Sequence, residues 1–96
     1  MAKVTPTGAT EVFDRSDLIP YDPAQGPREL GNVWVAFNET RRLVCTLFTH
    51  GLGWELRLMV MGGMFIRREV CTTQTQVFEM ADQWKQDAVA RGWRQR

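Results

Sequence analysis

The chain of 96 residues lacks an excess of charge of either sign, since twelve Lys and Arg stand against eleven Asp and Glu and the net charge is +1. A balance this even excludes a strong long-range field toward nucleic acid or an anionic membrane, so any basic patch must be local. The chain also lacks a long apolar run, and its first residues, MAKVTPTG, are unlike a signal peptide or a membrane span. We therefore expect a cytoplasmic protein that does not associate with membranes.

Cysteine and histidine are scarce, and their positions argue against a metal or a nucleophilic site. Cys45, Cys71 and His50 have none of the close paired spacing of zinc sites. Cys45 and His50 are five residues apart on one expected strand, and an odd separation places them on opposite faces. Phosphate-binding and dinucleotide motifs are absent too. The sequence thus predicts buried thiols, a turn role for His50, no cofactor and no enzymatic activity.

Proline is confined to the first third of the chain, where all four residues of this type precede Gly31. Proline fixes φ and removes a backbone donor, so this segment cannot form a long regular element. We predict that residues 1–31 are an extended or partly disordered N-terminal arm and that residues 32–96 form the domain. Within the arm, residues 10–13 can form a strand or a docking clip, and residues 19–21 can lie against the domain.

The domain shows four segments of strand character followed by one helix. Residues 33–37, 43–49, 54–60 and 64–71 are rich in β-branched, aromatic or alternating residues, and the short loops between them favour an antiparallel meander. Apolar residues then recur at helical spacing over residues 74–91. Thr73 with Gln76 fits a capping box, Thr72 with Thr75 is the alternative, and Gly92 fits a C-terminal cap. The predicted fold class is α+β: a four-stranded antiparallel meander with one C-terminal helix packed on one face.

The register of the last two strands decides which side chains share a face. A two-residue turn through Met61-Gly62 places Phe65 opposite Leu58 and Arg68 opposite Glu55, which pairs opposite charges. A three-residue loop is the alternative, and it brings two arginines together. In either case the sheet has apolar residues on both faces, and one helix covers only one of them. We expect the other face to be covered by the arm, by a second copy of the chain or by a nucleic-acid strand.

Four antiparallel strands followed by a helix, over residues 32–93, resemble the repeat unit of the PUR and Whirly-type folds. The resemblance implies single-stranded nucleic-acid binding by two packed units whose sheets carry aromatic and basic residues. It concerns topology and transfers no family residue. The segment ADQWKQDAVARGW, residues 81–93, is also similar to the terminal helix of many short bacterial proteins, and that likeness implies no function.

Aromatic and arginine residues interleave along the expected strands, as in surfaces that stack bases and pair with phosphates. We predict a small binding module that forms a homodimer and contacts single-stranded nucleic acid through Arg57, Arg67, Arg68, Trp34 and Phe48. A simpler interpretation places the aromatic rings in the core and the arginines in a solvated fringe. The alternative function is a protein-interaction module, with Met59, Met64 and Ile66 at the interface and the arm as a strap.

Overall fold

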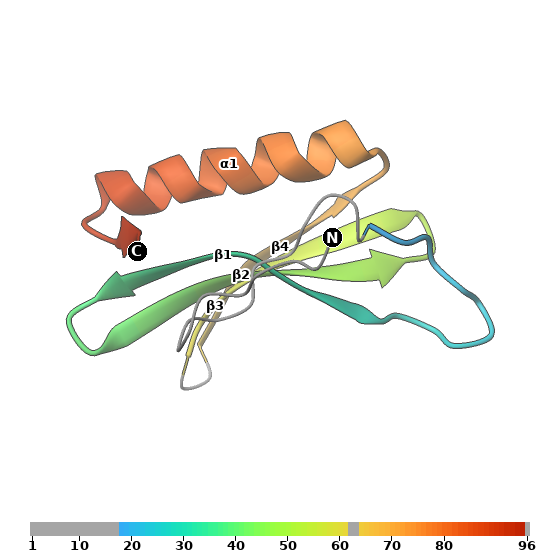
Figure 1. The fold of residues 1–96 in the computed structure, drawn as a ribbon, viewed down its shortest axis with the longest axis horizontal. Coiled ribbons are helices and arrows are strands. Elements are labelled where there is room, and N and C mark those ends of the chain that lie inside the picture. Colours follow the sequence, from blue (N-terminus) through green and yellow to red (C-terminus); the bar gives the residue numbers. More distant parts are fainter. Residues whose placement is uncertain (1–17, 62–63, 96) are drawn as a thin grey trace, which may run out of the picture.

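The computed structural model describes residues 18–61 and 64–95, with the side chain of Met64 left out of the description (Figure 1). Its elements in chain order are β1 (Glu29–Asn38), β2 (Arg41–His50), β3 (Gly53–Val60), β4 (Met64–Cys71), α1 (Gln74–Ala90) and β5 (Arg94–Gln95). They form one antiparallel sheet in the order β4-β3-β2-β1-β5. The predicted meander with a C-terminal helix is confirmed, and β5 extends it beyond β1.

Helix α1 lies along one face of the twisted sheet and forms the core with it (Figure 1). Side chains of β1, β2 and β3 that alternate along each strand meet one stripe of the helix, because strand residues two apart and helix residues three or four apart share a face. The core residues are Trp34, Ala36, Leu43, Cys45, Leu47, Leu56, Leu58, Val60, Cys71, Val77, Ala81, Trp84 and Ala88. No helix in the described ranges is long and apolar enough to cross a membrane.

Hydrogen bonds of the expected kinds hold both ends of α1. Thr73 is the N-cap, and its hydroxyl accepts from the backbone N–H of Gln76 at 3.1 Å. The Gln76 carboxamide accepts from the backbone N–H of Thr72 at 2.8 Å, one residue before the position of an ordinary capping box. At the other end Gly92 has φ of 99°, a conformation that glycine adopts without strain, and the Trp93 N–H donates to the Ala88 carbonyl at 3.0 Å.

Replacing Thr73 with alanine is expected to lower the free energy of unfolding by about 1 kcal/mol, because the first turn of α1 loses the side-chain acceptor of its cap. Urea denaturation followed by circular dichroism measures the change. Thr75→Ala is the matched control, since Thr75 is exposed in the first turn and its side chain makes no hydrogen bond within the described residues. An equal loss in both variants would contradict the cap assignment.

The described chain begins against the core. As predicted for residues 19–21, this segment contacts the domain: the Trp54 indole N–H donates to the Ile19 carbonyl at 2.9 Å. The Thr49 N–H donates to the Arg28 carbonyl at 2.8 Å, so regular pairing starts earlier than expected and β1 begins at Glu29. The strand or clip predicted at residues 10–13 lies outside the described residues.

The predicted register of β3 and β4 is wrong. Val60 pairs with Met64, as expected for the alternative three-residue loop and not for the two-residue turn. A bulge between Leu58 and Met59 then shifts the pairing by one further residue. Phe65 therefore lies opposite Met59 rather than Leu58, and Arg68 lies opposite Arg57 rather than Glu55. Registers with facing arginines are unfavourable on charge alone, and the prediction included no bulge. A bulge adds one residue to one strand and turns the following side chains to the other face.

Candidate binding site: the β4 edge and the second sheet face

The sheet face turned away from α1, called the second face from here on, has no described helix over it (Figure 1). The strand registers place its side chains in rows across the sheet. It is made of Val35, Phe37, Arg42, Val44, Thr46, Phe48, Glu55, Arg57, Met59, Phe65, Arg68 and Val70. The central part on β2 is largely buried, whereas the part contributed by β4 is exposed. The accessible apolar surface is thus concentrated at one edge.

Glu55 organises the charges of the second face. The residue is 7% exposed, and its carboxylate accepts from Arg57 Nη2 at 3.0 Å, with Arg68 Nε at 3.7 Å from its other oxygen. The Arg57 guanidinium also lies 4.0 Å from the Phe48 ring centroid, and that of Arg68 lies 6.0 Å from the Phe65 centroid. One carboxylate between two guanidinium groups explains how two arginines can face each other across the strands.

Arg42, also on the second face, has one buried donor without a partner among the described residues. Its Nε atom is buried and has no acceptor in the described part of the chain. A buried donor without a partner costs about 1–3 kcal/mol, so such a group needs an explanation. Together with Arg57 and Arg68 it outnumbers Glu55, the carboxylate in the same set. Among the residues of this set, three guanidinium groups therefore stand against one carboxylate.

The predicted nucleic-acid residues are separated by the fold. Arg57, Arg68 and Phe48 lie together on the second face. Trp34 is 6% exposed under α1, and its indole N–H donates to the Ala81 carbonyl at 2.8 Å. Arg67 lies on the helix side, with its guanidinium 4.6 Å from the Trp84 ring centroid. Neither of the last two can share a surface with the first three.

The predicted interface residues are also divided. Met59 lies on the second face opposite Phe65. Ile66 lines a groove of about 360 Å³ between β4 and α1, together with Arg67, Trp84 and Trp93. Met64 pairs with Val60 at the backbone, and its side chain lies outside the description. Glu55 was not among the predicted site residues, although its spacing of two from Arg57 on one strand already indicates a same-face ion pair.

Strand β4 is an open edge of the sheet. It is last in the strand order, and no described strand pairs with its outer side. Residues 65–70 are all exposed, and three of them are large and apolar: Phe65 at 47%, Ile66 at 46% and Val70 at 41%. A long edge with free backbone donors, free acceptors and apolar side chains favours the addition of another strand. Within the described residues, this edge combines an unpaired strand with three exposed apolar side chains.

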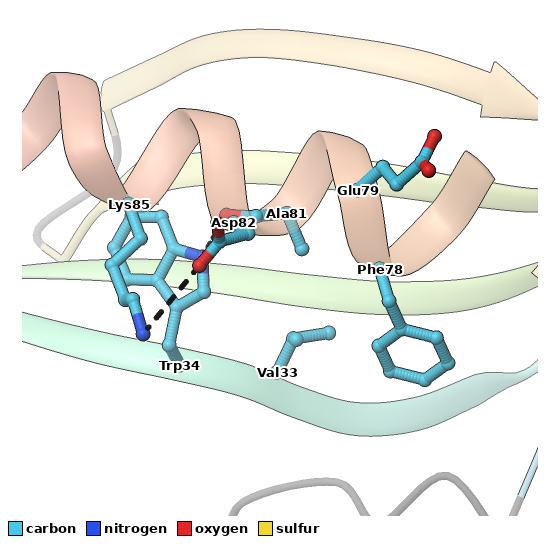
Figure 2. A pocket seen from close by; sticks show the side chains of 7 residues that line it. All are labelled: Val33, Trp34, Phe78, Glu79, Ala81, Asp82 and Lys85. Carbon is cyan, nitrogen blue, oxygen red and sulfur yellow. Dashed lines mark hydrogen bonds and ion pairs between the residues drawn. The ribbon is translucent and has the colours of Figure 1, made fainter. Parts of the chain in front are cut away.

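A second groove, of about 400 Å³, runs between β1 and α1 (Figure 2). Figure 2 shows the Trp34 ring rising from β1 toward the helix, with Lys85 and Asp82 at the rim joined by an ion pair of 3.8 Å. Elsewhere on the described chain, no three His, Cys, Asp or Glu side chains come together as metal ligands would. His50 has the predicted turn role, because its Nδ1 accepts from the Leu52 N–H at 3.0 Å.

Both cysteines are expected to be unreactive in the folded protein. Burial raises the pKa of Cys45 to about 12, and burial together with nearby Glu69 raises the pKa of Cys71. The thiolate is the reactive form, so modification by a thiol reagent at pH 8 should be at least about tenfold slower in the native than in the denatured protein. Ellman's reagent with and without guanidinium checks this. Equal rates would contradict the burial of both thiols.

The raised thiol pKa also predicts how stability depends on pH. The folded pKa of Cys45, about 12, lies above an unfolded pKa of about 8.5. The native state therefore holds the proton more tightly, and this contribution to stability is complete below the unfolded pKa. It is lost as pH rises through that range toward the folded pKa.

Comparisons of the chain with known protein families, curated proteins and solved structures find no match. The fold and the surface define the chain as a small α+β sheet-and-helix domain with an exposed edge strand and a charged, partly aromatic sheet face.

Proposed function

We propose that this chain is a non-catalytic binding module that forms a homodimer through the outer edge of β4. The observation that carries the proposal is the exposed edge itself. Phe65, Ile66 and Val70 lie on it, each more than two-fifths exposed. Proteins usually protect such an edge with a bulge, with charges or with a covering segment. The bulge near Ile66 protects one end of β4, whereas residues 67–71 form a regular ladder with β3 and remain open on the outside.

Burial of the three apolar side chains supplies the driving force in this proposal. Each side chain of this size contributes about 1.5–3 kcal/mol when it is taken fully out of water, and partial burial contributes less. New backbone hydrogen bonds along the edge add to the gain. A dimer of this kind does not use the second face as its contact and joins the two second faces into one surface, because the two sheets continue into each other.

Light scattering coupled to size exclusion, over a hundredfold range of concentration, tests the proposal. We expect a dimer for the native chain and a monomer for Val70→Lys, since a charge on an edge strand opposes pairing. Val89→Lys is the matched control, because Val89 is 50% exposed on α1, away from the edge. A native chain that stays monomeric throughout would overturn the proposal, as would equal dissociation of both variants.

A second candidate function is supported by the guanidinium and aromatic groups of the second face. Arg57 with Phe48 and Arg68 with Phe65 provide the paired cationic and aromatic groups that single-stranded nucleic-acid sites use. The likeness in topology to PUR and Whirly-type units points the same way. The near-zero net charge weakens this candidate relative to self-association.

Fluorescence anisotropy with a mixed-sequence single-stranded oligonucleotide at two salt concentrations tests the second candidate. Binding should weaken steeply with salt, and the double variant R57A/R68A should reduce the salt slope by about 0.7 for each phosphate that the protein no longer neutralises. Arg91→Ala, at the exposed end of α1, is the control. Binding that is independent of salt concentration, or an equal change of the salt slope in Arg91→Ala, would exclude phosphate contacts on the second face. A protein partner would then be the candidate to test.

A further inference from the structure

We infer that the two copies pair β4 against β4 in an antiparallel register centred on Arg68, so that Arg67 of each copy faces Glu69 of the other. This inference rests on the proposed self-association and deepens it by naming the contacts. It is carried by the order of charges and apolar side chains along an edge that no described strand covers.

Symmetry limits the possible registers. Two identical edges that pair antiparallel are related by a twofold axis, and rotation about an axis normal to the sheet is the operation that brings them side by side. Such a rotation keeps each side chain on its own face. Both helices then lie on the same side of the joined sheet, and the residue at the axis faces its own copy. Choosing the central residue therefore defines every other pair.

The charged side chains distinguish the possible centres. An axis at Arg67 brings two Arg67 guanidinium groups together, and an axis at Glu69 brings two carboxylates together, so both leave charges unpaired. An axis at Arg68 places Arg67 opposite Glu69 twice. Both of these residues lie on the helix side, since β3 pairs them with Leu58 and Leu56. No side-chain hydrogen bond or ion pair joins either of them to another described residue, and the Arg67 guanidinium contacts the Trp84 ring.

The same register brings the exposed apolar side chains together. With Arg68 at the axis, Val70 of one copy comes opposite the Ile66 end of the other, beside Phe65. Ile66 lies on the helix side, so Phe65 and Val70 on the second face, exposed by 47% and 41%, are the apolar side chains that come near each other at both ends of the paired segment. Cross-strand neighbours of this kind contribute about 0.2–1 kcal/mol per pair beyond burial. Charge and apolar patterns thus select one register.

One pair in this register is unfavourable. The two Arg68 guanidinium groups meet on the second face, and like charges that face each other directly destabilise a sheet. In each copy the Glu55 carboxylate lies 3.7 Å from Arg68 Nε and offsets part of this repulsion. Two attractive Arg67–Glu69 pairs outweigh the single, partly neutralised contact.

Charge reversal at the two positions tests the register. Arg67→Glu and Glu69→Arg should each raise the dimer dissociation constant at least about tenfold, because two attractive pairs become repulsive. The double variant R67E/E69R should return it to within about threefold of the native value, since it restores opposite charges. Analytical ultracentrifugation at micromolar concentrations measures all four proteins. Arg94→Glu, on β5 at the opposite edge of the sheet, controls for net charge, and thermal melting controls for removal of the Arg67–Trp84 interaction within one chain.

A cross-linking experiment adds an independent measurement. Arg68→Cys places a thiol at the axis, where opposite residues are within reach of a disulfide. Mild oxidation should join its two copies, whereas Val70→Cys, on the same edge but opposite Ile66, should not. The native cysteines are buried and do not interfere.

The possible results distinguish a failure of the proposed register from a failure of the proposed self-association. A dimer that charge reversal leaves intact, or one in which Val70→Cys cross-links in place of Arg68→Cys, overturns the register while self-association stands. A native chain that is monomeric at every concentration overturns both.

Discussion

Replacing Trp34 with alanine is expected to lower the free energy of unfolding by about 3–5 kcal/mol, a large fraction of the stability of a domain this small. The indole is 6% exposed between β1 and α1, and its N–H donates to the Ala81 carbonyl at 2.8 Å. The variant loses the buried ring, leaves a cavity at the centre of the core and removes the side-chain hydrogen bond to the Ala81 carbonyl. Urea denaturation followed by tryptophan fluorescence and circular dichroism measures the loss.

Trp34→Phe is the informative companion. It keeps an aromatic ring in the core but removes the indole N–H, so the loss should be smaller than for alanine. Neither variant is expected to change oligonucleotide affinity while it remains folded, because the ring lies under the helix. A folded Trp34→Ala variant of nearly native stability that no longer binds the oligonucleotide would instead return Trp34 to a stacking role.

Replacing Gly53 with alanine is expected to cost about 3 kcal/mol or more, because two separate effects add. Gly53 has φ of +142°, a conformation that residues with a side chain rarely adopt. A Cβ atom there would also overlap the backbone carbonyl of Cys71 and lie 3.0 Å from the Thr72 Cα. Backbone atoms cannot move aside as a flexible side chain can, so β3 and β4 would have to separate at this end.

Gly92→Ala provides the matched control for this prediction. Gly92 also has positive φ, +99°, but no heavy atom lies within 4 Å of the position its Cβ would take. Gly92→Ala therefore loses stability only through the unfavourable backbone conformation. The difference in unfolding free energy between the two variants measures the cost of the clash with Cys71. Urea denaturation of both variants measures the two losses of stability. Equal losses would show that the close approach of β3 and the end of β4 is absent in solution.

Self-association and binding of an anion to the second face are thermodynamically linked in these proposals. In the proposed dimer the two Arg68 side chains lie together at the twofold axis. An anionic strand bound across this axis would reduce their repulsion, so it should bind the dimer more tightly than the monomer. A ligand that favours one state shifts the equilibrium toward it. The oligonucleotide should therefore lower the dimer dissociation constant, and this effect should disappear at high salt.

Local patterns in the sequence were enough to predict the elements and much of the core. The alternation of apolar residues over β3 and the helical spacing over α1 predict which stripe of each faces inward, because these periods follow from backbone geometry alone. Thr73 and Gly92 mark the ends of α1 for the same local reason. The turn role of His50 also follows from its neighbours in the chain, since its ring bonds to a backbone N–H two residues away.

The candidate site was decided by tertiary structure. A single bulge near Ile66 turns Phe65 onto the second face and leaves Arg67 on the helix side, against Trp84. The position of a bulge in a pair of strands cannot be predicted from the local sequence pattern. The short strand β5 also forms only because the end of α1 lies close to β1, where β5 pairs with Ala36 and Phe37. The sequence by itself therefore determined β1 to β4 and α1, their order, and the inward faces of β3 and α1. Only the register between distant segments, which depends on packing across the whole sheet, decided which arginines and aromatic rings share a surface.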